Sequence, residues 1–304
     1  MTGQPFISVI IPTRGRGGQL RQCLASLADL TYPRERWEVI VVEDGDEQQP
    51  DGRVETLGER LPFQYLQQPH AGCGIARNTG AAKARGRYLV FTDDDCLFPT
   101  DWLHRFEEEF QRTPCCVVAG RSINALKGNP YSQATQELMD YLHTMFNASP
   151  GQAMFAAGNN MGVPAEGFRE LGGFSLRYIR MAAEDRDFCA RWVAAGRQMV
   201  YAPDVVVRHA HRLDFRSFLR QHAHYGRGGF LFHRLQAQRQ QRGVQLEPAG
   251  FYFSLVLWPW RRRRGAEAVR LSLLLLLSQI AHTAGYLGGY LASRQHGDFG
   301  EKHS

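Results

Sequence analysis

The chain contains 304 residues, and 43% of them are hydrophobic, which is enough to form the core of one large α/β domain or of a domain with an appendage. This composition excludes a chain that is disordered along its whole length. The net charge of +6 indicates an anionic partner, but the basic residues are unevenly spread, with a dense group at Arg261–Arg264, and we expect no nucleic acid partner.

The six cysteines include no Cys-x-x-Cys pair and no metal-finger spacing. Free thiols in a reducing compartment are the simplest interpretation, without disulfides or zinc. The amino terminus is polar as far as Phe6 and then enters a strand pattern, so we expect no secretory signal peptide. These features predict that the folded part of the chain lies in the cytoplasm.

The first part of the chain alternates short β-rich runs with helical periodicity, which is typical of a mostly parallel sheet flanked by helices. The expected strands are Phe6–Ile11, Trp37–Val42, Phe63–Leu66, Tyr88–Thr92 and Cys116–Gly120, and the expected helices are Gly17–Leu30, Gly72–Ala84 and Trp102–Gln111. Ligands of such sheets bind beyond the carboxyl ends of the strands. We therefore expect a Rossmann-like α/β fold with its site at that edge.

Acidic residues stand where two of these strands end. Glu43 and Asp44 follow the second strand, and Asp93, Asp94 and Asp95 follow the fourth. Asp93 and Asp95 lie two positions apart, so a turn between them lets their oxygens converge on a hard cation such as Mg²⁺ or Mn²⁺. Such a cation can carry a diphosphate. A solvated acidic turn is the competing interpretation of the triplet on its own.

Further along the chain, residues 131–146 have helical periodicity with many polar positions, which fits a lid over the cleft or a wall beside it. The segment Gly158–Gly162 is small and polar. Glu184 and Asp185 open a helix that runs to Ala195, with Gly196 as its stop, and stabilisation of their charges by the helix dipole is the structural alternative to a role in the site. Two short strands, Met199–Tyr201 and Val205–Val207, lead to His209 and His211.

Six short motifs follow one another in a specific order and spacing: Ser8-Val9-Ile10-Ile11-Pro12-Thr13-Arg14, Val41-Val42-Glu43-Asp44-Gly45, Ala76-Arg77-Asn78-Thr79-Gly80, Asp93-Asp94-Asp95, Gly172-Gly173-Phe174 and Glu184-Asp185-Arg186-Asp187. Over about residues 6 to 212 the chain resembles family 2 glycosyltransferases with the GT-A fold. The resemblance implies a metal-dependent, inverting transfer of a sugar, usually from a UDP-sugar, to an acceptor hydroxyl.

The resemblance also implies roles for individual residues. Pro12, Thr13 and Arg14 border the nucleobase, and Glu43 and Asp44 form the acidic pair that contacts uracil, with Glu43 standing where Asp is usual. Arg77 lies near the nucleotide phosphates, and Asn78 supports its loop or makes a helix-start hydrogen bond. Asp93 reaches the ribose, Asp94 completes the triplet, and Asp95, with Asp93, holds Mn²⁺ or Mg²⁺. Asp185 is the general base, with Glu184 beside it.

Two histidine segments are open to more than one interpretation. In related enzymes a histidine near this position can bind the metal or the departing phosphate, so His209 has one of these roles or is a hydrogen-bonded structural residue. The polar segment Gln221–Gly228, with His222 and His224, fits either a closure over the diphosphate or a solvated helix end.

The last third differs from the catalytic part, and we expect a catalytic domain of residues 1–212 followed by a helical region of residues 213–304. Leu271–Ala292 is apolar and just long enough to span about 30 Å of bilayer core. Trp258 and Trp260 beside Arg261–Arg264 resemble an interfacial belt facing anionic lipid, with the positive side in the cytoplasm. A helix crossing the membrane, a helix lying in its interface, and a buried hairpin or homodimer interface all fit this pattern.

The expected partners are therefore a nucleotide sugar, a glycan or lipid-linked acceptor of the kind used to build surface polysaccharides, and the inner face of the cell membrane. Two other functions are compatible with parts of the sequence. A sugar-nucleotide nucleotidyltransferase also combines paired acids with a metal, and Gly15-Arg16-Gly17-Gly18 is a faint match to its phosphate loop. A non-catalytic protein that binds anions or membranes would account for the basic cluster.

Overall fold

The computed structural model describes residues 4–45, 61–148 and 151–295, and the chain forms two compact units. The first unit comprises Met1–Ala125, Phe146–Arg180 and Asp185–Ala210, and the second comprises Leu126–Met145, Met181–Glu184 and His211–Ser304. These units are structural and each contains several chain segments. The expected functional division into residues 1–212 and 213–304 therefore stays a prediction.

The described part of the first unit is organised around one sheet, with the strand order β3-β2-β1-β4-β7-β6-β8-β5. Strand β1 pairs in parallel with β2 and β4, β2 with β3, and β6 with β8, whereas β7 and β5 are antiparallel to their neighbours. The carboxyl ends of β1, β2, β4 and β8 consequently lie along one edge. The strands are β1 (Ile7–Thr13), β2 (Trp37–Asp44), β3 (Phe63–Gln68), β4 (Tyr88–Thr92), β5 (Cys96–Leu97), β6 (Val117–Asn124), β7 (Asn160–Pro164) and β8 (Met199–His209).

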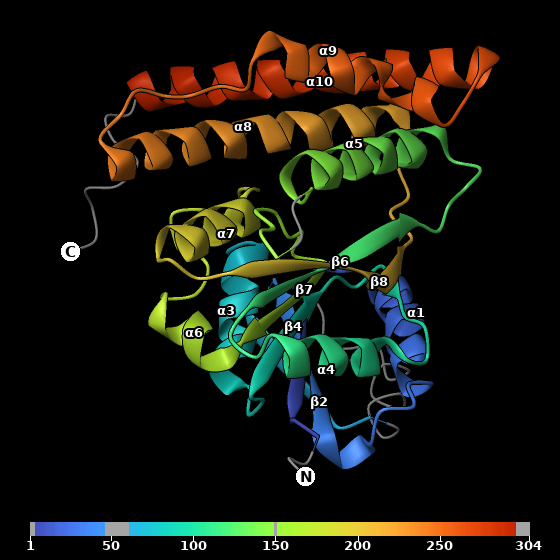
Figure 1. Ribbon diagram of the computed structural model, residues 1–304, viewed down its shortest axis with the longest axis vertical. Helices are drawn as coiled ribbons and strands as arrows, with labels where there is room; N and C mark the ends of the chain where they lie inside the picture. Colours follow the sequence, from blue (N-terminus) through green and yellow to red (C-terminus); the bar gives the residue numbers. More distant parts are fainter. Residues whose placement is uncertain (1–3, 46–60, 149–150, 296–304) are drawn as a thin grey trace. The chain divides into compact units, whose positions relative to one another are not determined.

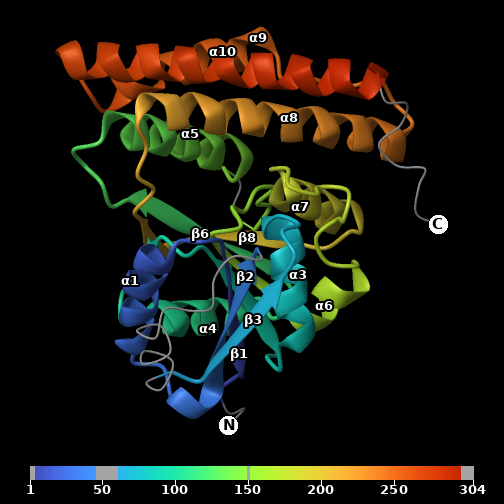
Figure 2. The same ribbon diagram turned by 180° about the vertical axis from the view of Figure 1, so that it is seen from behind.

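Helices cover both faces of this sheet, which explains why β1, β2 and β4 are buried at every position. On one face lie α1 (Gly17–Ala28) and α4 (Trp102–Arg112), and the short helix η1 (Arg34–Arg36) precedes β2. On the other face lie α3 (Cys73–Lys83), α6 (Ala165–Glu170) and α7 (Glu184–Ala194), as Figures 1 and 2 show from opposite sides. The predicted α/β class with a mostly parallel sheet is confirmed.

The structure adds to the sequence analysis at two segments. Gly158–Gly162, which the sequence marks only as small and polar, runs into the buried strand β7, where the Asn160 side chain is satisfied by donating to the carbonyls of Arg121 and Val205. The two short strands expected between Met199 and Val207 form one strand, β8, whose register against β6 shifts between Gly120 and Arg121.

The described part of the second unit is helical and comprises α5 (Pro130–Phe146, of which Phe146 belongs to the first unit), α8 (Phe215–Gln240), α9 (Ala249–Leu257), η2 (Trp258–Arg261) and α10 (Gly265–Gln295). Helix α8 begins with a capping box, in which Asp214 Oδ1 accepts from Ser217 N at 2.7 Å. Aromatic and leucine side chains of α5, α9, η2 and α10 share a core around Tyr141, Leu255 and Leu275.

Small residues allow α8 and α10 to lie side by side, as both views of the ribbon show (Figures 1 and 2). A Cβ on Gly226 of α8 would collide with the carbonyl oxygen of His282, and one on Gly285 of α10 with the carbonyl oxygen of Ala223. Gly228 likewise faces the carbonyl of Ala182 in the segment before α7. The segment Gln221–Gly228 therefore lies inside a packed helix.

One helix of the described residues, α10, is long and apolar enough to cross a membrane. Its length and composition fit a core helix of a soluble protein as well.

Candidate active site

Thr13 connects two strand ends at the edge where the site was predicted. It ends β1 opposite Glu43 of β2, and its hydroxyl donates to Asp94 Oδ2 at 2.6 Å. Asp94 is buried, and burial raises its pKa to about 6, although Arg16 and Thr13 act in the opposite direction. The side chain of Asp94 therefore ties the loop after β4 to the end of β1.

Arg16 lies across two carboxylates of the aspartate triplet. Its Nη1 is 3.0 Å from Asp94 Oδ1 and 3.5 Å from Asp95 Oδ2. Burial lowers the pKa of the guanidinium, but the charges of Asp94, Asp95 and Asp93 outweigh this effect and raise the pKa above its usual value. Gly15, with a φ of 62°, makes the turn after β1 that brings Arg16 to the acids.

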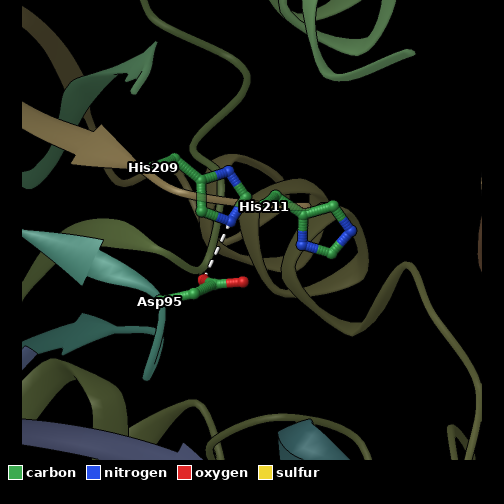
Figure 3. A group of neighbouring side chains, drawn as sticks. All are labelled: Asp95, His209 and His211. Carbon is green, nitrogen blue, oxygen red and sulfur yellow. Dashed lines mark ion pairs between the residues drawn. The ribbon is translucent and has the colours of Figure 1, made fainter. Parts of the chain in front are cut away.

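Asp95 and His209 face each other where β5 pairs with β8 (Figure 3). His209 Nε2 lies 3.0 Å from Asp95 Oδ1, and the backbone of Ala210 donates to the carbonyl of Asp95 at 2.8 Å. Burial lowers the pKa of His209, but its contact with Asp95 raises it above its ordinary value. Figure 3 also draws His211, two residues further along the chain.

A buried carboxylate beside an imidazole nitrogen is a donor set that suits Mn²⁺, and a carboxylate-rich setting suits Mg²⁺ as well. The residues predicted as metal ligands, Asp95 and His209, therefore fit a divalent cation chemically. Asp93, the third predicted ligand, has one carboxylate oxygen engaged by Arg77 Nη2 at 2.7 Å, and its side chain is 30% exposed.

Asp185 is linked to the triplet through Arg77 and Gly158. A Cβ on Gly158 would lie 2.8 Å from Cζ of Arg77, so only glycine leaves room for the guanidinium that binds Asp93. The backbone N–H of Gly158 donates to Asp185 Oδ2 at 3.0 Å, and that of Arg186 donates to Asp185 Oδ1 at 2.7 Å. The structure thus brings Asp93 and Asp185 to the same part of the first unit, although they are far apart in sequence.

Glu43 and Asp44 use their oxygens largely within the chain. Asp44 Oδ1 accepts from Gln68 and from the backbone of Ala71, and its Oδ2 contacts His70 Nδ1 and accepts from the backbone of Gly72, all at 2.8 Å. Burial raises the pKa of Asp44, but these hydrogen bonds outweigh it and lower the pKa below its usual value.

Glu43 Oε1 accepts from the backbone of Gly15 at 3.0 Å, and Glu43 Oε2 accepts from the Tyr65 hydroxyl at 3.3 Å. Burial and the charge of Glu43 raise the pKa of Tyr65 to about 12. Arg14 is exposed, and its Nη1 lies 3.0 Å from His70 Nε2. The acidic pair therefore shapes the two loops that carry Arg14 and His70.

Asn78 supports a turn. It donates to the carbonyl of Phe174 at 2.7 Å and accepts from the backbone of Phe174 at 2.9 Å, which fixes the Gly172-Gly173-Phe174 motif. Pro12 is buried within β1 and contributes to the sheet. Glu184 is buried at the start of α7, next to Asp185.

Arg16 and His70 were not among the residues predicted for a glycosyltransferase site, and Arg16 appeared only in the faint match to the phosphate loop of a nucleotidyltransferase. The signal for Arg16 was the glycine-rich loop directly after a strand, which in a parallel sheet turns back over the ligand edge. His70 carried no recognisable signal, because its role depends on a contact with Asp44 that no local pattern predicts.

The model of the glycosyl transferase family 2 matches residues 8–172, which is more than half of the chain. The chain belongs to glycosyl transferase family 2. Among curated relatives of this family 2 enzyme, the pre-mycofactocin glycosyltransferase of Mycobacterium tuberculosis is 28% identical over 230 residues, covering 72% of this chain but only 46% of the relative. Glycosyltransferase AglE of Haloferax volcanii is 26% identical over 236 residues, covering 74% of this chain and 73% of AglE.

Solved structures confirm the GT-A-like fold. A mannosyltransferase of Pyrobaculum calidifontis, in complex with GDP-Man and Mn²⁺, superposes with a TM-score of 0.62 at 20% identity and covers 96% of this chain and 81% of that one. TarS of S. aureus, residues 1–349 with UDP-GlcNAc, gives a TM-score of 0.57 at 17% identity, with 97% and 93% coverage. At these identities the likeness concerns the fold alone.

Proposed function

We propose that this family 2 enzyme transfers a sugar from a nucleoside diphosphate sugar, with UDP as the expected nucleotide, to an acceptor hydroxyl, and that it inverts the anomeric configuration. The observation that carries this proposal is the linkage of Asp93 and Asp185 through Arg77 and Gly158, because it brings the acid expected to bind the donor near the candidate base. The fold neighbours described with GDP-Man and Mn²⁺ or with UDP-GlcNAc support a nucleotide sugar as donor.

Asp185 is the proposed general base. An acceptor hydroxyl is a poor nucleophile at neutral pH, and a carboxylate within hydrogen-bond reach can remove its proton as the new bond forms. The backbone donors of Gly158 and Arg186 fix the orientation of the Asp185 carboxylate, which is half-buried. A single displacement with this base and the diphosphate on opposite sides of the anomeric carbon gives inversion. Glu184 would help to shape the acceptor side.

Asp95 and His209, with Asp93, would hold Mn²⁺ or Mg²⁺, which supplies positive charge to the departing diphosphate. Arg77 would contribute to the same end of the site, since it is buried and held in place by Asp93. On the nucleobase side, Thr13, Arg14 and Glu43 lie at the ends of β1 and β2, where Arg14 is exposed and able to meet a base. Asp44 would act there by holding His70 and the backbone that follows it.

We also propose that the second unit binds the cytoplasmic face of a membrane. Apolar side chains of α10 are exposed at intervals of three, four or seven residues, which places them on one side of the helix: Val269, Leu273, Leu276, Ile280, Leu287 and Leu291. Phe253 and Trp260 are also exposed. An acceptor linked to lipid, as used in building surface polysaccharides, would be presented at such a surface.

The four arginines at 261–264 divide into two pairs. Arg262 binds Asp140 at 2.7 Å, and Arg263 lies 3.7 Å from Glu137, so these two fasten η2 and the loop after it to α5. Arg261 contacts the ring of Trp258, and Arg264 is exposed. Arg261 and Arg264 are therefore available to anionic lipid headgroups. Each arginine near such a surface contributes about 1 kcal/mol to the free energy of binding.

A position of α10 in the plane of the membrane interface fits the packing better than a crossing. Buried residues of α10 such as Leu271, Leu275 and Gly285 pack within the second unit, and α8, which lies alongside, carries arginines over its whole length. A crossing α10 would have to leave α8 or carry these charges into hydrocarbon, which is costly. An amphipathic arrangement avoids both.

A screen of sugar nucleotides with Mn²⁺ or Mg²⁺, using lipid and glycan extracts as acceptors, tests the enzymatic proposal. Cation-dependent release of a nucleoside diphosphate, with transfer of the sugar to an extract component, is the expected result. Release of pyrophosphate would identify a nucleotidyltransferase instead. Absence of turnover with every donor, in a protein that still binds anions or membranes, would favour a non-catalytic role.

A further inference from the structure

We propose that Arg16 is a binding residue for the donor diphosphate, and that in the cation-free enzyme it contacts Asp95, a carboxylate which the divalent cation must use. This inference rests on the proposed function. Its starting point is the pair of contacts from Nη1 of Arg16 to Asp94 and Asp95, at 3.0 and 3.5 Å. The Arg16 side chain is 46% exposed, whereas those of Asp94 and Asp95 are 4% and 2% exposed, so its guanidinium stands between two buried acids and the solvent.

Asp95 has two different neighbours for its two oxygens. Oδ1 lies against His209, and Oδ2 lies against Arg16. A divalent cation bound by Asp95 and His209 would carry two positive charges within a few ångströms of the guanidinium. Like charges at this distance repel, so cation binding must weaken or displace the contact between Arg16 and Asp95.

The surroundings of Arg16 allow such a displacement. Its shorter contact is with Asp94, whose other oxygen is held by Thr13, so Arg16 can keep one acidic partner while it leaves Asp95. On either side of it, Gly15 and Gly17 have open space where a side chain would be. The guanidinium can therefore change its position without meeting a side chain of either neighbour in the chain, while the backbone stays held by the bond from Gly15 to Glu43.

A diphosphate attached to the cation at Asp95 would bring its oxygens within reach of the displaced guanidinium. Among the described residues both acid contacts of Arg16 use Nη1 alone, which leaves Nε and Nη2 to donate to phosphate. Arginine binds phosphate through parallel N–H donors, so this pairing is chemically favourable. Arg16 would thus oppose the bare cation and favour the complex of cation and nucleotide.

This arrangement predicts effects of opposite sign, which a merely structural role would not give. Mn²⁺ binding without nucleotide is measured by the loss of free-Mn²⁺ signal in electron paramagnetic resonance, and UDP binding at saturating Mn²⁺ by calorimetry. In Arg16→Gln, Mn²⁺ alone should bind on the order of tenfold more tightly, and UDP with Mn²⁺ on the order of tenfold more weakly.

Two further variants complete the experiment. Arg16→Lys keeps the charge but not the fork of donors, so its Mn²⁺ affinity should stay near that of the wild type while its UDP affinity falls. Arg14→Gln is the matched control for Mn²⁺ alone, because Arg14 lies two residues away and contacts His70 rather than the triplet. Its affinity for Mn²⁺ should not change. Thermal unfolding of each variant shows whether it is folded.

Unchanged or weaker Mn²⁺ binding by folded Arg16→Gln would overturn the inference, and so would unchanged UDP binding. In either case the proposed function would stand if the wild type still binds Mn²⁺ and needs it for turnover. A wild-type protein that binds no Mn²⁺ and needs no divalent cation would overturn both the inference and the metal dependence of the proposed function.

Discussion

Asp44 accepts hydrogen bonds from two backbone N–H groups and from Gln68, and it also contacts His70. A carboxylate engaged in this way is held ionised, and it holds the loop from His70 to Gly72 against the end of β2. Its effect on nucleotide binding would then pass through the position of that loop. A carboxylate with only solvent around it would have no such structural role.

Asp44→Asn should lower the free energy of unfolding by about 2 kcal/mol at pH 7, because an amide nitrogen would face at least one N–H donor. The lowered pKa of Asp44 sets the pH dependence. The stability that its charge contributes is present above the ordinary carboxyl pKa near 4 and is lost as the pH falls through the lower folded value. Urea unfolding at pH 7 and pH 3 measures this, with exposed Asp204→Asn as a control that should change little at either pH.

Single residues also show where sequence reasoning reaches its limit. The acids at strand ends were predictable, because strand patterns and their order define one ligand edge. The partners of those acids were not, since Arg16, His70 and Gly158 reach them through loops whose course depends on distant contacts. Asn78 carried a family motif, yet its bonds to Phe174 became visible only in three dimensions.

At the scale of elements, the contact between α8 and α10 depends on glycines that leave no space for a methyl group. Gly285→Ala should force the helices apart and lower the free energy of unfolding by about 1–3 kcal/mol, the usual cost of overpacking. Gly288 lies on the same helix, and no atom lies within 4 Å of the point where its Cβ would stand. Gly288→Ala should therefore be neutral or stabilise by up to about 1 kcal/mol through helix propensity.

Denaturant unfolding followed by circular dichroism distinguishes these two variants. Equal stability of Gly285→Ala and Gly288→Ala would contradict the close approach of α8 and α10 that the structure shows.

A second element-scale prediction concerns His222 of α8, which is buried against the rings of Phe218 and Tyr225. Burial, with a smaller effect of His282, lowers its pKa to about 4. The unfolded chain binds this proton near pH 6.5 and the folded chain does not, so stability falls as the pH drops below that value. At pH 5 the loss from this residue should be about 2 kcal/mol relative to pH 8.

His222→Phe keeps an aromatic side chain and removes the titration. The difference in unfolding free energy between the wild type and this variant, measured from pH 8 to pH 5, should change by the amount expected for His222. A difference that does not vary with pH would contradict the lowered pKa, because it would mean that His222 binds its proton equally well in the folded and the unfolded chain.

The long helices also illustrate why element boundaries were hard to predict. Gln221–Gly228 contains two histidines and two glycines, which weaken a helical pattern, but these glycines are the positions where α8 meets other segments of its unit. Packing against other helices, and not the helix propensity of these residues, therefore explains why the segment is helical. Similarly, Gly162 in β7 leaves room for the rings of Phe106 and Phe110. Glycine is required there by the packing of α4 and not by the local sequence of the strand.

For the whole molecule, we propose that the exposed apolar side of α10 brings the enzyme to a membrane surface. The protein should float with vesicles that contain phosphatidylglycerol and bind less to vesicles of phosphatidylcholine alone, because Arg261 and Arg264 favour anionic headgroups. Replacing Leu273, Leu276 and Ile280 by serine should abolish flotation while the protein stays folded, since these side chains are exposed.

Sedimentation of the same serine variant distinguishes the alternatives. A change from dimer to monomer without any effect on vesicle binding would identify the apolar side of α10 as a homodimer interface. Wild-type protein that is monomeric and does not float would contradict the membrane proposal.

We propose that Asp95 and Asp185 serve one reaction in different ways, the first through a bound cation and the second as a base. Parallel measurement of nucleotide binding and turnover, with the donor found in the screen, tests it most directly. Asp185→Asn should bind UDP with Mn²⁺ as the wild type does but lose turnover by about 10²-fold or more, whereas Asp95→Asn should lose Mn²⁺-dependent binding. Wild-type turnover by Asp185→Asn, or Mn²⁺-dependent UDP binding that survives in Asp95→Asn, would contradict the account.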